Sequence, residues 1–191
     1  QTKLGDIGYT DVNGDGKIDG EDQVRIGKPT MPHFTYAFDF SLGYEGFTLS
    51  GLLYGTGERY MTFGNRYQSG EGKYLYYENQ LNYWRPDNTG ADFPRISISS
   101  GVNGNNNKAG STFWMRNASY LRLKDLQLSY DFKYKYLKKC DWLQTCRVNL
   151  SGSNLFTISG VSKFFDPETS STSGDGYPVQ RVYSIGVTIG F

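Results

Sequence analysis

The C-terminal stretch QRVYSIGVTIGF constrains the fold more than any other part of the chain. From Tyr183 onward its odd positions are apolar and its even positions are small or polar. Successive side chains of a strand point to opposite faces, so the stretch predicts a strand with one apolar face. Termini of soluble proteins usually fray into water, whereas a membrane strand needs an apolar side toward lipid and an aromatic residue at the interface. The expected outer-membrane strand signal is Tyr183, Ile185, Val187, Ile189 and Phe191.

A second stretch shows the same alternation near the start of the chain. Between Phe34 and Tyr44 every second residue is apolar, and this is about the 9–11 residues that a tilted strand needs to cross a membrane. Glu45 and Gly46 then form a turn signal. A further alternating run begins at Phe47. The pattern predicts a long hairpin with a minimal turn.

Two more strands are expected in the second half of the chain, over 117–132 and 146–156. In the first of these, Leu121 and Leu123 share one parity, and Leu126 and Leu128 share the other. A β-bulge near Lys124 would explain the switch, because one extra residue reverses the parity.

The lengths of the connections predict the topology. Short connections (45–46 and 133–145) alternate with long ones (55–115 and 157–178). Outer-membrane barrels have short periplasmic turns and long extracellular loops. We therefore expect an all-β fold: about five C-terminal antiparallel strands of a large transmembrane β-barrel, with long extracellular loops. Five strands cannot close a barrel, and open edges are not tolerated in lipid, so other sequence must supply the remaining strands.

The predicted organisation has two parts. Residues 1–32 carry no hydrophobic period and are expected to form an extracellular loop, while 33–191 would form the barrel segment. No apolar run approaches the roughly 18 residues of a membrane helix. The first residues also lack the basic and apolar pattern of a signal peptide, so we expect this sequence to be part of a longer protein.

Charge and cysteine content exclude some functions and leave others open. Lys plus Arg (20) nearly balances Asp plus Glu (19), which gives no sign of a nucleic-acid partner. Cys140 and Cys146 fit no zinc spacing; a disulfide and two free thiols are both compatible with the sequence. Asp166 and Glu168 lie in an FDPE loop where nothing predicts the raised pKa of a catalytic acid. We expect no enzyme activity.

The order of several motifs resembles the C-terminal end of SusC/RagA-type TonB-dependent outer-membrane transporters. The matching motifs are GDIGYTDVNGDGKIDGEDQVRIGKPTMPHFTYAFDFSLGYEGFTLSGLLYG, YWRPDNTGADFPRI, FWMRNASYLRLKDLQLSYDF, LSGSNLFTIS, FDPE and GYPVQRVYSIGVTIGF. The resemblance implies a barrel of about 22 strands with a plug and a SusD-like surface lipoprotein as partner. It also implies import of an oligosaccharide or peptide substrate, driven by the TonB complex through an N-terminal part that this sequence lacks.

The acidic loop DVNGDGKIDGED has the ligand spacing of an EF-hand calcium loop, with Gly16 at loop position 6. The pattern is similar to the single-loop calcium sites of dockerin modules. The predicted role of calcium is structural, and the alternative is an Asx/Gly turn without metal. The candidate ligands are Asp11, Asn13, Asp15, Lys17 (through its carbonyl), Asp19 and Asp22.

Other interpretations remain open from the sequence. The chain is 16% aromatic and contains 24 glycines, a composition that also suits a soluble, calcium-stabilised carbohydrate-binding β-module. An adhesin or a passive porin would share the barrel pattern. A stretch over 73–84 favours a short helix. Its aromatic residues would stack on sugar rings or pack the loop: Tyr74, Tyr76, Tyr77, Tyr83 and Trp84.

Overall fold

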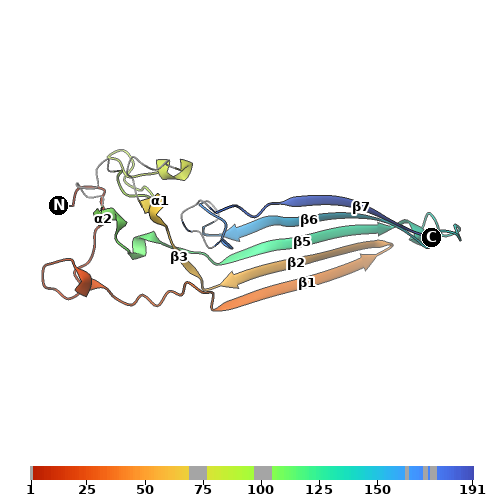
Figure 1. The fold of residues 1–191 in the computed structure, drawn as a ribbon, viewed down its shortest axis with the longest axis horizontal. Coiled ribbons are helices and arrows are strands. Elements are labelled where there is room, and N and C mark those ends of the chain that lie inside the picture. Colours follow the sequence, from red (N-terminus) through yellow and green to blue (C-terminus); the bar gives the residue numbers. More distant parts are fainter. Residues whose placement is uncertain (1, 69–76, 97–104, 162–163, 170–171, 173–175) are drawn as a thin grey trace.

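The molecule is built on one long antiparallel sheet with the order β1-β2-β5-β6-β7 (Figure 1). The structure is a computed structural model that describes residues 2–68, 77–96, 105–161, 164–169, 172 and 176–191. Neighbouring strands are antiparallel throughout, which confirms the predicted fold class. The strands are β1 (Phe34–Tyr44), β2 (Phe47–Gly57), β5 (Tyr120–Asp131), β6 (Thr145–Ser159) and β7 (Val182–Gly190).

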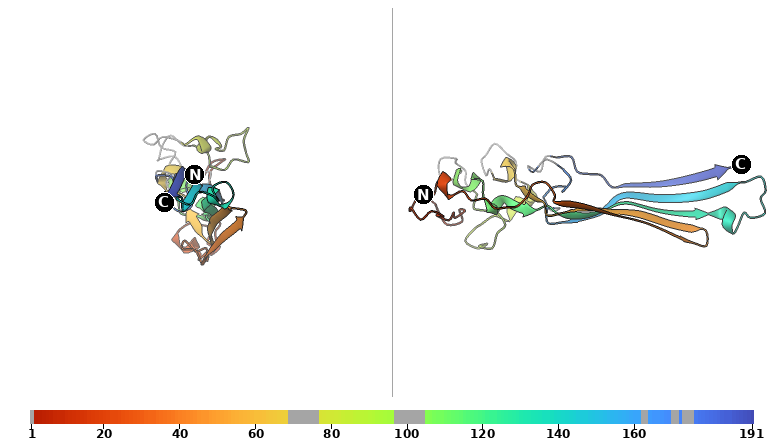
Figure 2. Two further views of the ribbon diagram at one scale, coloured as in Figure 1. Left: turned by 90° about the vertical axis from the view of Figure 1, so that its right-hand side faces the viewer. Right: turned by 90° about the horizontal axis from the view of Figure 1, so that it is seen from below.

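A second region, which we call the cap, lies beyond one end of this sheet. It consists of the described residues among 2–33, 58–119 and 160–181. The chain enters the cap after β2 and returns to the large sheet after β4. Within the cap, β3 and β4 pair as a separate two-stranded sheet. Figure 2 shows the same division from a second side, with the strands at one end and the cap at the other. The described elements of the cap are η1 (Gly20–Asp22), β3 (Tyr60–Thr62), α1 (Asn65–Gln68), η2 (Glu78–Leu81), α2 (Asn105–Lys108), η4 (Thr112–Trp114) and β4 (Met115–Asn117).

The strand register places all the predicted apolar residues on one face of the sheet. Directly paired residues share a face, and Phe38 pairs with Leu53, which pairs with Leu123. The register shifts at Lys124, on β5, in both neighbouring pairings. This confirms the predicted bulge, and its consequence is that the leucines before and after it face the same side. The apolar face includes Leu42, Leu49, Leu126, Leu128, Val148, Leu150, Ile185 and Val187.

The turns at the other end of the sheet also follow the prediction. Glu45 and Gly46 both have positive φ and join β1 to β2, which suits a two-residue hairpin turn. The basic connection after β5 begins with one 3₁₀ turn, η5 (Phe132–Tyr134).

Three predicted boundaries were wrong. β2 continues to Gly57, where the sequence suggested a loop from residue 55. β6 continues to Ser159, three residues beyond its expected end. The strand expected over 117–132 is divided, because β4 ends at Asn117 and β5 begins at Tyr120. The part of the expected 73–84 helix that the structure describes is only η2; residues 73–76 lie outside the described residues.

Aromatic rings explain why β2 tolerates glycines that otherwise indicate turns. Phe34 pairs with Gly57, and Phe40 pairs with Gly51. A Cβ at Gly51 would lie 2.7 Å from the ring Cζ of Phe40. The rings of β1 therefore lie over the bare backbone of β2, an arrangement that compensates for glycine within a strand.

The cap has a conventional buried core, although its segments lack a hydrophobic period. Phe63 stacks on Tyr67 with a centroid distance of 4.8 Å and meets the edge of Phe164 at the same distance. The indole Nε1 of Trp114 donates to the carbonyl of Asn107 at 2.8 Å. The buried residues come from all three cap segments: Ile7, Met61, Phe63, Tyr67, Phe93, Trp114, Ala118, Val161 and Phe165.

The N-terminal segment is fixed to this core by polar contacts. The Asp6 carboxylate pairs with Arg95 Nε at 2.7 Å and accepts from Asn107 Nδ2 at 3.0 Å. Asn107 Oδ1 in turn accepts from the backbone N–H of Ile7 at 2.8 Å. Asp6 and Ile7 thus attach the N-terminal segment to the cap. Among the described residues, no helix has the length and apolar content to cross a membrane.

Candidate functional site

The apolar face of the sheet is exposed and side chains of its polar face are buried, which is the reverse of the arrangement in a soluble protein. On the apolar face, Ile185 is 74% exposed and Val187 is 63% exposed. On the opposite, polar face, Arg122 is only 1% exposed, and Thr56 and Ser129 are buried. β7 is an edge strand, but the same face is also exposed on an inner strand, where Leu150 of β6 is 48% exposed. No layer of described residues covers the apolar face.

The residues of the expected strand signal lie in β7, except Phe191, which follows it. Ile185 pairs with Leu150, and Val187 pairs with Val148, so the signal continues the apolar face of β6. Phe191 follows β7 and its ring stacks on Trp142, with centroids 5.7 Å apart and planes 13° apart. The structure thus brings the signal residues together with a larger apolar surface.

A buried ion network joins the polar face of the sheet to the cap. Arg122 Nη2 pairs with Asp166 Oδ2 at 2.6 Å, and its Nη1 pairs with Glu168 Oε2 at 2.9 Å. Its Nε donates to Thr157 Oγ1 at 2.8 Å. Lys124 Nζ lies 3.0 Å from Glu168 Oε1. The FDPE loop is therefore fixed to β5 by a buried cation whose charge is fully compensated.

The environment of Glu168 is that of a structural carboxylate. Burial alone would raise its pKa, but hydrogen bonds from Tyr120 and Lys124 and the charge of Arg122 hold the pKa below its usual value. A general acid needs the opposite shift. Tyr120 donates to Glu168 Oε1 at 2.8 Å, and a guanidinium N–H of Arg59 donates to the Pro167 carbonyl.

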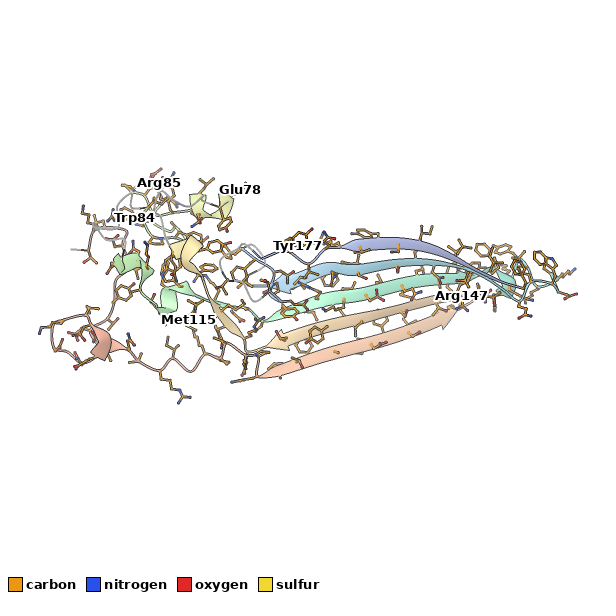
Figure 3. The ribbon with its side chains drawn as sticks, viewed as in Figure 1. Glu78, Trp84, Arg85, Met115, Arg147 and Tyr177 are labelled. Carbon is orange, nitrogen blue, oxygen red and sulfur yellow. The ribbon has the colours of Figure 1, made fainter. Side chains whose placement is uncertain are left out.

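A hollow of about 460 Å³ lies beside this network, between β6, the FDPE loop and the segment before β7. Its wall includes Arg122, Asp166, Phe165 and Arg181. Tyr177, labelled in Figure 3, is exposed in the segment that leads to it. The hollow opens on the polar face of the sheet.

Sequence reasoning missed this network. From the sequence, Asp166 and Glu168 suggest only a catalytic pair, and Arg122 has no predicted role. One signal was present: Arg122 lies on the polar parity of a strand that is otherwise rich in leucine. A buried charge at such a position requires a partner, and FDPE offers two carboxylates.

The acidic loop folds into a chain of Asx-type turns. The Asp11 carboxylate accepts from the N–H groups of Gly14 at 2.6 Å and Gly16 at 2.7 Å. Asp22 accepts from Val12 at 2.7 Å and from Asp19 at 2.9 Å. The first and last positions of the predicted loop thus lie close together, as a calcium loop requires.

The fit of this loop to calcium is incomplete. The oxygen donors suit a hard cation, and the loop closes on itself. However, the described residues contain no group of three or more His, Cys, Asp or Glu side chains gathered to hold a metal ion. The carboxylates of Asp11 and Asp22 are directed at backbone amides instead. The calcium site stays a prediction.

The aromatic residues of the cap pack within it. Tyr83 and Tyr77 lie against the buried core, and the Trp84 ring covers Gly5. Of the two interpretations open from sequence, these contacts favour packing. Cys140 and Cys146 are free thiols in the structure.

Comparisons with known proteins give relatives of one kind. No family model matches the chain. Two proteins of Formosa agariphila match over nearly all of it: TonB-dependent receptor P3 (27% identity, 96% of this chain, 19% of the relative) and TonB-dependent receptor P26 (27% identity, 98% and 20%). This chain therefore spans about a fifth of the length of the curated relatives that it matches.

Solved structures agree with these relatives. The chain is similar to the RagAB peptide importer in the open-open state, with TM-score 0.68 and 27% identity over 92% of this chain and 19% of that one. It is also similar to the RagAB peptide transporter, with TM-score 0.69 and 26% identity over the same shares.

Fold and relatives together define a segment of an outer-membrane β-barrel wall with its attached cap. More specifically, the chain corresponds to the C-terminal part of a SusC/RagA-type TonB-dependent transporter. Its place is the outer membrane of Gram-negative bacteria. The relatives are receptors and transporters, which points away from catalysis.

Proposed function

We propose that this chain forms part of a TonB-dependent transporter that imports oligosaccharides or peptides across the outer membrane. The sheet is a section of the barrel wall with its apolar face in lipid, and the cap is extracellular. The observation that carries this proposal is the exposed apolar face, which is continuous over five strands, opposite a polar face that holds a buried arginine.

The long connections support the orientation. Both enter the cap, whereas the two short turns lie at the other end of the sheet (Figure 1). Long extracellular loops and short periplasmic turns are the rule in these barrels. The cap is thus extracellular, and the turn after β5 is periplasmic.

A SusD-like lipoprotein is the proposed partner, and the TonB complex would act through the part of the protein outside this sequence. Two similar structures are described as a peptide importer and a peptide transporter, which supports uptake of oligomers. The motif resemblance extends the substrate class to oligosaccharides. Calcium in the acidic loop would rigidify the cap.

Two substitutions on adjacent residues test the membrane orientation in the full-length transporter. Val187→Arg places a charge in lipid and is expected to cost about 2–4 kcal/mol of folding free energy. Thr188→Arg, on the polar face, is expected to cost much less. The measurement is a denaturant titration of the protein folded in lipid vesicles. Equal costs for both variants would contradict the orientation.

Uptake and partnership need a separate test. A strain that lacks the transporter should lose growth on one oligopeptide or oligosaccharide source and recover it with the intact gene. The SusD-like protein should copurify with the tagged transporter after mild detergent extraction. Normal growth of the deletion strain on every oligomer tested would refute the import role and leave the membrane orientation intact.

A further inference from the structure

The end of the sheet opposite the cap gathers aromatic side chains. The ring of Tyr130 lies 4.4 Å from that of Phe47. Tyr134 packs against Gly46, so the two short turns touch. The Trp142–Phe191 stack joins the same region to the chain's last residue. The side chains in Figure 3 crowd together beyond the strands at this end.

The connection after β5, residues 132–144, also carries four lysines; we call it the basic turn. Lys133 has a structural role, because its Nζ donates to the carbonyls of Cys140 and Leu143. Lys135, Lys138 and Lys139 are exposed. Among the described residues these three form no ion pair; the Lys138 ammonium lies 5.4 Å from the ring centre of Tyr134.

Few acidic groups offset these charges. Asp131 is 3.8 Å from Arg147 and accepts from the Lys133 backbone N–H. Asp141, within the turn, and Glu45, in the neighbouring turn, are the other carboxylate side chains at this end of the sheet. The basic turn itself therefore has an excess of positive charge on its exposed side.

We propose that the basic turn binds the phosphates of anionic phospholipid headgroups in the periplasmic leaflet, with Lys135, Lys138 and Lys139 as the contacts. The proposal rests on the proposed membrane orientation. Its basis is continuity: the lipid-facing surface runs along the strands to Tyr44 and Tyr130 and ends at amphipathic rings with exposed lysines just beyond them. Aromatic rings settle at the headgroup level of a membrane.

The positive charge of the three lysines supplies the specificity for anionic lipids. Each lysine or arginine near an anionic membrane surface contributes attraction that falls off within a Debye length. The aromatic rings hold the turn at the depth where the phosphates lie. Lys133 keeps the turn compact, so the other three ammonium groups are presented on a short, ordered stretch.

The test replaces the three lysines by glutamine in the full-length transporter. The protein is placed in nanodiscs of phosphatidylcholine mixed with phosphatidylglycerol, and the lipids retained on its release are measured by native mass spectrometry. Wild type should retain phosphatidylglycerol preferentially. The triple variant should lose about tenfold or more of that preference, and high salt should reduce the wild-type preference in the same direction.

Matched controls separate charge from position and from folding. Lys3→Gln, Lys17→Gln and Arg25→Gln together remove three exposed cations from the cap and should leave the preference unchanged. Trp142→Ala should weaken anchoring equally in neutral and anionic lipid.

Each outcome decides the proposal. An unchanged phosphatidylglycerol preference in the triple lysine variant would overturn it. So would equal losses in the cap variant. If Val187→Arg and Thr188→Arg proved equally tolerated, the membrane orientation would fail instead, and the two failures are thus distinguishable.

Discussion

The sheet and the cap bury their apolar side chains in opposite ways. In the cap, Trp114 is fully buried and Val161 is as well. In the sheet, Ile185 and Val187 are largely exposed, and the charged side chain of Arg122 is buried. Apolar burial is driven by water, so the cap folds as a water-soluble unit would. In the proposed orientation, the sheet gains its apolar contacts from lipid. One chain therefore follows two rules, according to the solvent around each part.

The ion network lies where the two regions meet. Arg122 belongs to the sheet, while Asp166 and Glu168 belong to the cap. Charged pairs are strong in a low dielectric but need complete compensation there. A compensated arginine can tie a water-soluble body to a barrel wall without an apolar interface between them.

The largest expected effect is the loss of stability when a tryptophan of the cap core is removed, compared with the loss of an exposed tryptophan at the other end of the molecule. Trp114→Ala opens a cavity in the cap core and should cost about 3–5 kcal/mol. Trp142→Ala, at the end of the sheet opposite the cap and 67% exposed, should leave the cap unchanged. Hydrogen exchange of cap amides in the detergent-solubilised full-length protein measures both. Equal protection of the cap in the two variants would mean that the core does not stabilise it.

Local sequence patterns predicted the sheet well. The strict alternation from Phe34 to Tyr44 gave both ends of β1, and the parity switch between Leu123 and Leu126 located the bulge. Each of these two signals lies within one strand, the first in β1 and the second in β5. The predicted end of β2 was wrong because Gly55 and Gly57 locally indicate a turn. The aromatic rings that cover these two glycines come from β1, a different strand.

The cap and the ion network lay beyond local patterns. Phe63, Trp114 and Val161 meet from distant segments that have no period of their own. Arg122 and Asp166 are 44 residues apart in the chain. Such contacts depend on tertiary packing, and a single sequence carries little record of them.

Calcium binding would increase the difference in stability between the cap and the sheet, because it would stabilise only the cap. If the acidic loop binds it, calcium at a hundred times its dissociation constant should add about 2.7 kcal/mol to cap stability. Magnesium at equal ionic strength should add little. Asp15→Ala should abolish the calcium increment. Thermal unfolding with calcium and with EDTA gives the measurement, and identical curves for the wild type would leave the Asx-turn interpretation.

A smaller effect is expected within the sheet. Gly51→Ala places a Cβ 2.7 Å from the Phe40 ring and 3.1 Å from the Asp125 carbonyl, so the ring must turn away at a cost of about 1–3 kcal/mol. Gly186→Ala is the control, since nothing lies within 4 Å of the added atom. It should change stability by less than about 0.5 kcal/mol. Denaturant titration in vesicles compares them, and a tolerated Gly51→Ala would contradict the ring-over-glycine packing.

The smallest effect is the response of the sheet–cap junction to acid. The pKa of Glu168 is held below its usual value in the folded protein, so its contribution is present above the unfolded pKa and is lost as the pH falls through the lowered folded value. Hydrogen exchange of residues 164–169 should stay constant from neutral pH down to about 4.5, the ordinary value of the group, and accelerate below it once intrinsic exchange is corrected. Glu168→Gln should remove this acceleration, whereas Asp6→Asn, which disturbs an ion pair elsewhere in the cap, should leave it. If the acceleration persisted in Glu168→Gln, the acid response of the junction would come from groups other than this carboxylate, and the pair of Arg122 with Asp166 would be the first to examine.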